Sequence, residues 1–208
     1  MKGFGLTMGI LIASAVAITG CTAANDAQKI PKADGRSSTT GSPLGWESEF
    51  EQASRHATTE FEREALADGR ISDAEFAEME NSFVDCLRER NVSFGGFGPA
   101  GGYGFTPGTG TTTGEANSIA DECSASSGLN TVGYLYFAMK RNPQNLDEAT
   151  ITAACLVEKK VVPQTYTASD YARDTPTRAY PFTDAARGEK AMEGCDTDPL
   201  GLLDGQKR

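Results

Sequence analysis

Four cysteines downstream of the N-terminal segment constrain the fold more than any other feature of this chain. They are Cys86, Cys123, Cys155 and Cys195. Outside the cytoplasm, an even number of cysteines is typical of disulfides. A zinc site is the alternative, but its cysteines stand in close pairs, whereas these lie 30 to 40 residues apart and His56 is the only histidine. We therefore expect two disulfides and no metal site.

The first twenty-one residues predict where the protein is located. Lys2 precedes an apolar run from Phe4 to Ile18, which is shorter than the roughly twenty residues of a membrane-spanning helix and is typical of a signal peptide. The run ends in the tetrapeptide Ile-Thr-Gly-Cys at Cys21, which resembles the lipobox of bacterial lipoproteins. This resemblance implies that the Cys21 thiol receives a diacylglyceryl group, with acyl chains such as palmitate, and becomes the new N-terminus. A plain secretory leader cut nearby is the alternative.

We therefore expect a lipid-anchored protein on the outer face of the cytoplasmic membrane. Loss of residues 1–20 removes one basic residue and no acidic one, so the net charge changes from −10 to −11. The chain has no cluster of Lys or Arg, so nucleic-acid binding is not expected. An anionic membrane surface would repel the acidic chain, so the lipid must provide the anchor.

Composition divides the chain into four parts. Residues 1–20 are the predicted signal peptide, and residues 21–45 are a lipidated, disordered tether of mostly polar residues. Residues 46–198 are predicted to form a single helix-rich globular domain, which is long enough for one hydrophobic core. Residues 199–208 are predicted to be a flexible tail.

Periodic apolar residues predict two helices at the start of this domain. The first runs from Trp46 to Ala65 with apolar residues at steps of three or four, and an Asp-Gly pair then ends it. Ser72 and Glu75 predict a capping box at the start of the second helix. Its predicted buried stripe consists of Phe76, Met79, Phe83, Cys86 and Leu87.

The rest of the domain alternates between helices and extended or irregular chain. Residues 91–94 favour a short strand, and the glycine-rich residues 95–110 favour a loop or loose hairpin. Helices are predicted at residues 115–123, at 131–140, at 142–160 with Pro143 in the first position, and at 183–195. Short strands are predicted at residues 161–162 and 165–167, and irregular chain at 168–182.

Two stretches around the cysteines resemble each other. Residues 86–92 (CLRERNV) match residues 155–161 (CLVEKKV), and each leads through irregular chain to an alanine-rich helix that ends in cysteine. If the halves are structural copies, the bridges are Cys86–Cys123 and Cys155–Cys195. Each bridge would then stabilise the fold by about 4 kcal/mol by restricting the unfolded chain. Chance similarity is the alternative.

One segment carries a family resemblance. Residues 66–76 (LADGRISDAEF), with Cys86-Leu87 ten residues later, resemble a segment of uncharacterised small exported proteins and lipoproteins of actinobacteria. The resemblance covers about residues 60–125 and implies a helix, a turn, a second helix and a cysteine. It implies no functional residue, because those proteins lack an assigned activity. The glycine-rich residues 95–110 depart from the pattern.

Three patterns suggest known sites but fail on their surroundings. Residues 96–101 match G-x-G-x-x-G, but the glycines and proline that follow forbid the helix that a dinucleotide site needs. The calcium-loop pattern that begins at Asp196 has Leu200 and Lys207 where oxygen ligands are required. His56 lies on the polar side of its predicted helix, and no G-x-S-x-G motif accompanies it. We therefore predict no catalytic, cofactor-binding or metal-binding residue.

Acidic side chains between residues 60 and 80 are predicted to form a solvated helix face. They are Glu60, Glu62, Glu64, Asp73, Glu75, Glu78 and Glu80. A glycosidase needs two carboxylates across a cleft, and the sequence alone does not place such a pair.

The aromatic residues of the glycine-rich segment are the candidate partner contacts. They are Phe97, Tyr103 and Phe105, with Phe94 just before them. The neighbouring glycines would let these rings face a partner, as in binding loops. Alternatively, the rings pack against the core and the glycines only turn the chain.

Together these features predict a mostly α-helical α+β fold with two pseudo-repeated, disulfide-closed halves and short hairpin-like segments. The first hypothesis for function is a non-enzymatic surface lipoprotein that interacts with a protein or polymer of the cell envelope. The alternative is a hydrolase of envelope polymers with two carboxylates about 5–10 Å apart. A transporter's solute-binding component is a third hypothesis, but the domain is short for two closing lobes.

Overall fold

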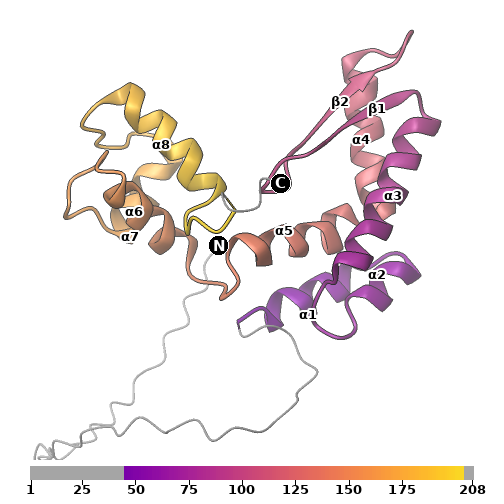
Figure 1. Ribbon diagram of the computed structural model, residues 1–208, viewed down its shortest axis with the longest axis horizontal. Helices are drawn as coiled ribbons and strands as arrows, with labels where there is room; N and C mark the ends of the chain where they lie inside the picture. Colours follow the sequence, from indigo (N-terminus) through magenta and orange to yellow (C-terminus); the bar gives the residue numbers. More distant parts are fainter. Residues whose placement is uncertain (1–44, 204–208) are drawn as a thin grey trace, which may run out of the picture. The chain divides into compact units, whose positions relative to one another are not determined.

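The computed structural model describes residues 45–203 of the chain (Figure 1). The predicted signal peptide, the lipid-bearing Cys21 and the tether up to residue 44 lie outside the described residues, as do residues 204–208. No helix of the described part is both long and apolar enough to span a membrane. Residues 45–203 form a mostly helical fold with a two-stranded antiparallel sheet and two disulfides, which confirms the predicted fold class.

The two halves differ in their secondary structure. The first contains α1 (Glu47–His56), α2 (Glu60–Ala65), α3 (Asp73–Glu89), β1 (Val92–Phe97), β2 (Tyr103–Pro107), α4 (Thr113–Ser127), the π-helical turn η1 (Leu129–Gly133) and α5 (Tyr134–Arg141). The second contains α6 (Glu148–Glu158), α7 (Ala168–Asp174), the 3-10 turn η2 (Thr175–Thr177) and α8 (Ala185–Thr197). The hairpin belongs to the first half, and short helical elements occupy the corresponding interval of the second.

The predicted single helix from Trp46 to Ala65 is wrong, because a capping box divides it. Thr59 Oγ1 accepts a hydrogen bond from Glu62 N at 3.1 Å, and Thr59 N donates to Glu62 Oε2 at 2.9 Å. Since these groups replace intrahelical partners, a new helix begins at Glu60. The box predicted at Ser72 and Glu75 is confirmed at the start of α3.

The hairpin β1–β2 places one row of aromatic rings against α3. The strands pair Val92 with Pro107 and Phe94 with Phe105, and their register is irregular between Phe94 and Phe97. On α3, the ring of Phe83 lies 5.6 Å from that of Phe94 and 5.0 Å from that of Tyr103. Figure 1 shows the hairpin beside α3 and α4, the two helices joined by the first disulfide.

The buried side chains form one cluster in each half. The first includes Met79, Phe83 and Leu87 of α3, all fully buried, together with residues of α1, α4 and α5. The second, which includes Leu156 of α6 and Met192 of α8, is smaller. We therefore expect the stability of the second half to depend more on its disulfide.

The disulfides are Cys86–Cys123 and Cys155–Cys195, as the repeat predicts, with Cα–Cα distances of 5.7 and 5.8 Å. The halves also share backbone features at matching positions. Asn91 and Lys160, at equal intervals after the first cysteine of each half, have φ of 61° and 57°. The valine that follows each of them is 2% exposed. Thr112 caps α4 and Asp184 caps α8, each eleven residues before the cysteine of that helix.

Three predictions about the second half are wrong, and side-chain hydrogen bonds explain where its helices begin. Residues 142–146 are not helical, because the Asn142 side chain donates to the carbonyl of Leu146 and accepts from its N–H, so that α6 begins only after Asp147. Residues 161–167 form no strand, and 168–174 are helical because Thr167 and Asp170 form a capping box. The domain also extends past residue 198, since Pro199 and Leu203 are buried.

Candidate functional site

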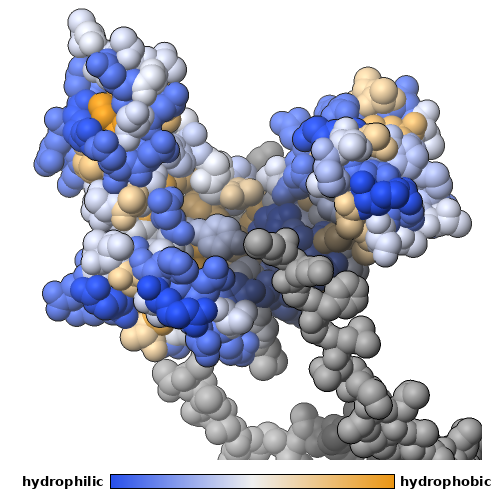
Figure 2. All heavy atoms as spheres, turned by 180° about the vertical axis from the view of Figure 1, so that it is seen from behind, coloured by the Kyte–Doolittle hydropathy of each residue, from blue (hydrophilic) through white to orange (hydrophobic). Residues whose placement is uncertain are grey.

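A cleft of about 910 Å³ lies beside α5. It is bounded by the start of α1, the hairpin turn, α4, η1 and α5, and by one residue each of α6 and α8. We call it the α5 cleft and define it by Glu49, Asp121, Asn130, Tyr134, Arg141, Glu148 and Asp196. The face shown in Figure 2 is hollowed, and hydrophobic residues are exposed there among hydrophilic ones.

Close packing makes one wall of the α5 cleft rigid. A Cβ atom on Gly101, at the hairpin turn, would lie 2.6 Å from the ring of Phe137, so only glycine fits there. The Phe137 ring lies 5.4 Å from that of Phe97. Tyr103 Oη lies 3.1 Å from Ser124 Oγ, a hydrogen bond that joins the hairpin to α4. The hairpin turn is therefore fixed against α4 and α5.

Tyr134 provides an exposed aromatic surface in the α5 cleft. This residue begins α5, directly after the turn η1, and is 61% exposed. Within residues 45–203, no ring contact or hydrogen bond holds its side chain. An aromatic face that is left open in a concave surface is available to a ligand.

Arg141 is held in place by the second half. Its Nη1 lies 2.7 Å from Glu148 Oε1, and its Nε donates to the backbone carbonyl of Asp196 at 3.1 Å. The guanidinium is thus committed to protein acceptors, and its side chain is only 17% exposed. The α5 cleft is lined by four carboxylates against this one cation, so its potential is negative.

Two carboxyl groups of the α5 cleft have pKa values shifted in opposite directions. Burial raises the pKa of Asp196, with a further contribution from Glu148, and these effects outweigh the lowering by Arg178, Arg141 and Tyr171. Burial also acts on Glu49, but hydrogen bonds from Asn145 and Ser48 outweigh it and lower the pKa of that carboxyl. Carboxyl groups with opposed shifts are a feature of acid–base sites.

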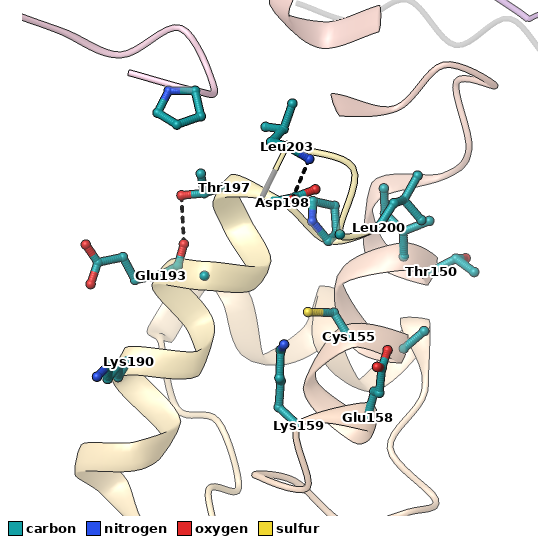
Figure 3. Close-up of a pocket in the computed structure, with 16 residues that line it drawn as sticks. Thr150, Cys155, Glu158, Lys159, Lys190, Glu193, Thr197, Asp198, Leu200 and Leu203 are labelled. Carbon is teal, nitrogen blue, oxygen red and sulfur yellow. Dashed lines mark hydrogen bonds between the residues drawn. The ribbon is translucent and has the colours of Figure 1, made fainter. Parts of the chain in front are cut away.

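A second hollow, of about 690 Å³, lies between α6 and α8 (Figure 3). It is lined by Glu158 at the end of α6, by Lys159 directly after it, and by Lys190 and Glu193 of α8, so its charges are mixed. Asp198 accepts hydrogen bonds from the backbone N–H groups of Leu202 and Leu203, both at 2.8 Å, and thereby folds the segment after α8. The polar groups at this end therefore stabilise the loop, and we take the α5 cleft as the candidate site.

The predicted partner contacts pack against the core. Phe97, Tyr103 and Phe105 are half-buried and join the first hydrophobic cluster. This arrangement supports the alternative in which the rings fold back and the glycines turn the chain. Cys21 lies outside the described residues, so its modification stays a prediction.

The prediction that the carboxylates at residues 60–80 all face solvent is wrong for Glu62, which is 3% exposed. Its Oε2 accepts hydrogen bonds from the N–H and hydroxyl groups of Thr58 and Thr59, and its Oε1 accepts one from Thr131 at 2.6 Å. Burial raises the pKa of Glu62, but these hydrogen bonds outweigh it and hold the pKa below its usual range. Because both oxygens are engaged, Glu62 stabilises the fold and is not open to a ligand.

The patterns excluded on sequence grounds have structural roles. Residues 96–101 form the end of β1 and the hairpin turn. His56 is exposed at the end of α1 and donates from Nδ1 to the carbonyl of Gln52 at 2.8 Å. Across residues 45–203, no group of three His, Cys, Asp or Glu side chains has the arrangement of a metal site.

The sequence did not predict the residues of the α5 cleft as a site. They come from positions between Trp46 and Asp196, and only the folded chain brings them together. Tyr134 lies within the apolar helix predicted over residues 131–140, but it begins α5 directly after the π-helical turn η1 and is exposed. No short motif marks such a site.

Comparison with known proteins adds no family. No family model, no curated protein and no solved structure matches this chain.

Proposed function

We propose that this chain is an exported, lipid-anchored protein on the outer face of the cytoplasmic membrane, which binds a component of the cell envelope in the α5 cleft. The leader and its terminal Cys21 support the anchoring. The two disulfides support an oxidising compartment. The resemblance of residues 66–76 to exported actinobacterial proteins agrees with this location.

The exposed Tyr134 is the observation that carries the binding role. A large aromatic side chain at 61% exposure remains in contact with water within a concave surface. The wall beside it is rigid, so little order is lost when a ligand binds. A non-enzymatic binding module accounts for both features.

Membrane fractionation tests the anchoring. We expect Cys21→Ser to move the protein from the detergent phase to the aqueous phase, because the mature chain would carry no acyl group. Ser37→Ala, in the predicted tether, is the matched control and should stay in the detergent phase. Equal partitioning of both variants into the detergent phase would contradict the anchor.

Co-sedimentation with isolated cell envelopes tests the binding role. We expect Tyr134→Ala to reduce the bound fraction of the detergent-solubilised protein. Leu202→Ala is the control, because it truncates another exposed apolar side chain, at 44% exposure, outside the α5 cleft. Equal binding of the two variants would argue against the α5 cleft as the site.

Hydrolysis of an envelope polymer is the second candidate function. The observation in its favour is that Asp196 and Glu49 line one cleft and have opposed pKa shifts. The group with the raised pKa would act as general acid and the other as base or nucleophile. Release of reducing ends from isolated envelopes, lost in both Asp196→Asn and Glu49→Gln, would support this role, and its absence in the unaltered protein would remove it.

A further inference from the structure

We propose that the α5 cleft binds an uncharged saccharide whose ring stacks on Tyr134. This inference rests on the proposed function, since it names the chemical class of the envelope ligand. The first argument is the aromatic face. Tyr134 is 61% exposed, and its neighbours Phe137 and Gly101 are fixed, so the ring lies beside a preformed surface. The apolar C–H face of a sugar ring fits a flat aromatic surface of this kind.

The rim of the α5 cleft offers both hydrogen-bond donors and acceptors. Asp121 on α4 and Asn130 in η1 line the cleft and are exposed. No hydrogen bond or ion pair engages either side chain within residues 45–203. A carboxylate accepts only, whereas an amide both donates and accepts, so together they match hydroxyl groups, which do both.

The charge of the α5 cleft disfavours an anionic ligand. Four carboxylates line the α5 cleft, and its one cation, Arg141, is bound to Glu148 and to the backbone of Asp196. A polyanion such as a uronate or phosphate polymer would meet repulsion without a free cation to offset it. An uncharged polymer of hydroxylated rings meets no such penalty, and its hydroxyl groups can donate to the carboxylates.

The size of the site agrees with this class of ligand. A volume of about 910 Å³ falls within the range of small-molecule sites, about 300–1,000 Å³, and exceeds what a single side chain fills. Tyr134, which lines the cleft, is itself exposed, so the proposed stacking surface is accessible from solvent.

Affinity electrophoresis in native gels tests the proposal. The detergent-solubilised full chain would run in gels that contain a neutral β-glucan, a neutral galactan, a neutral mannan or polygalacturonate. In a separate lane, hexalysine would be added to the sample. We expect at least one neutral polysaccharide to retard the protein and polygalacturonate to have no effect. Any mobility change with hexalysine should be equal in Tyr134→Ala, because it reports attraction to the acidic surface as a whole. Tyr134→Ala should weaken the retardation about tenfold, through the loss of stacking. Asp121→Asn tests whether the rim carboxylate contributes to the retardation. Leu202→Ala tests whether a change of the surface outside the cleft affects it.

The outcomes separate this proposal from the one on which it rests. Retardation that Tyr134→Ala weakens and Leu202→Ala retains supports the saccharide site, provided that circular dichroism shows both variants folded. Retardation by polygalacturonate, or equal retardation of both variants by a neutral polysaccharide, overturns it. If no polysaccharide retards the protein but isolated envelopes still retain it through Tyr134, the saccharide class is wrong and the envelope-binding role stands. If envelopes also fail to retain it, both proposals fail.

Discussion

At the scale of single residues, Glu62 shows how a charged group is kept inside the first half. Its carboxylate is buried, yet five hydrogen bonds from Thr58, Thr59 and Thr131 replace water. The capping interaction is local and follows from the T-x-x-E pattern. The bond from Thr131 crosses 69 positions of sequence, so no local pattern predicts the burial.

Replacing Glu62 by Gln should destabilise the protein by about 2–3 kcal/mol at neutral pH, because the amide NH₂ faces donors and leaves them unpaired. The folded-state pKa of Glu62 is below its ordinary value. Its stabilisation is therefore present above the unfolded-state pKa of about 4.3 and is lost as the pH falls through the folded-state pKa. Chemical unfolding at several pH values should show the difference from the unaltered protein narrowing as the pH falls below the unfolded-state pKa of about 4.3.

Glu64→Gln is the matched control for this series, since Glu64 lies on the same helix and is exposed. Its unfolding free energy should stay within about 0.5 kcal/mol of that of the unaltered protein. A gap between Glu62→Gln and the unaltered protein that does not change with pH would contradict the role given to the ionised carboxylate.

At the scale of elements, the hairpin β1–β2 stabilises the first half through one of its faces. Phe97 lies within 6.0 Å, between ring centroids, of Phe83 on α3 and within 5.4 Å of Phe137 on α5. Alternating residues such as Thr106 face solvent. The glycine-rich composition predicted the turn, but it did not distinguish rings that pack inwards from rings that face a partner.

Truncating Phe97 to Ala should lower the free energy of unfolding by about 2 kcal/mol, since the half-buried ring links three elements of the first cluster. Thermal or chemical unfolding followed by circular dichroism measures this. Thr106→Ala, on the exposed face of the same hairpin, should have little effect. Full stability of the Phe97 variant, together with weakened envelope binding, would instead favour the partner-contact alternative.

The sequence predicted a helix boundary correctly where a capping box marks it. The prediction was wrong where the same residues also fit another element. Ser72 and Glu75 marked the start of α3 correctly. Residues 165–167 are predicted as a strand, but Thr167 caps α7. Pro143 was read as a helix start, whereas the Asn142 side chain closes a loop around it. Side-chain hydrogen bonds to the backbone set the boundary in both of these cases.

At the scale of the whole molecule, the two disulfides each close one half. The pairing follows from the repeat in the sequence, and the shared positive φ at Asn91 and Lys160 extends it to the backbone. The α5 cleft did not follow from the repeat, because it gathers side chains from α1, α4, α5, α6 and α8. Long-range assembly of this kind depends on packing that no single segment encodes.

Removing the second disulfide should affect its own half most. In Cys155→Ser/Cys195→Ser, the free energy of unfolding of the second half, which has the smaller cluster, should fall by about 4 kcal/mol. We therefore expect α6 to α8 to lose protection in hydrogen exchange while α3 and α4 retain it. Cys86→Ser/Cys123→Ser is the comparison, and the larger cluster should keep α3 partly protected. Equal loss of protection across both halves would contradict their separate closure.

The covalent state of the native protein decides whether it is anchored outside the cytoplasm. Intact-mass spectrometry of the protein extracted from membranes, with and without reduction and alkylation, measures that state directly. We expect a chain that begins at an acylated Cys21 and resists alkylation at the four remaining cysteines until it is reduced. An unmodified Cys21, or thiols that react before reduction, would contradict an anchored protein outside the cytoplasm.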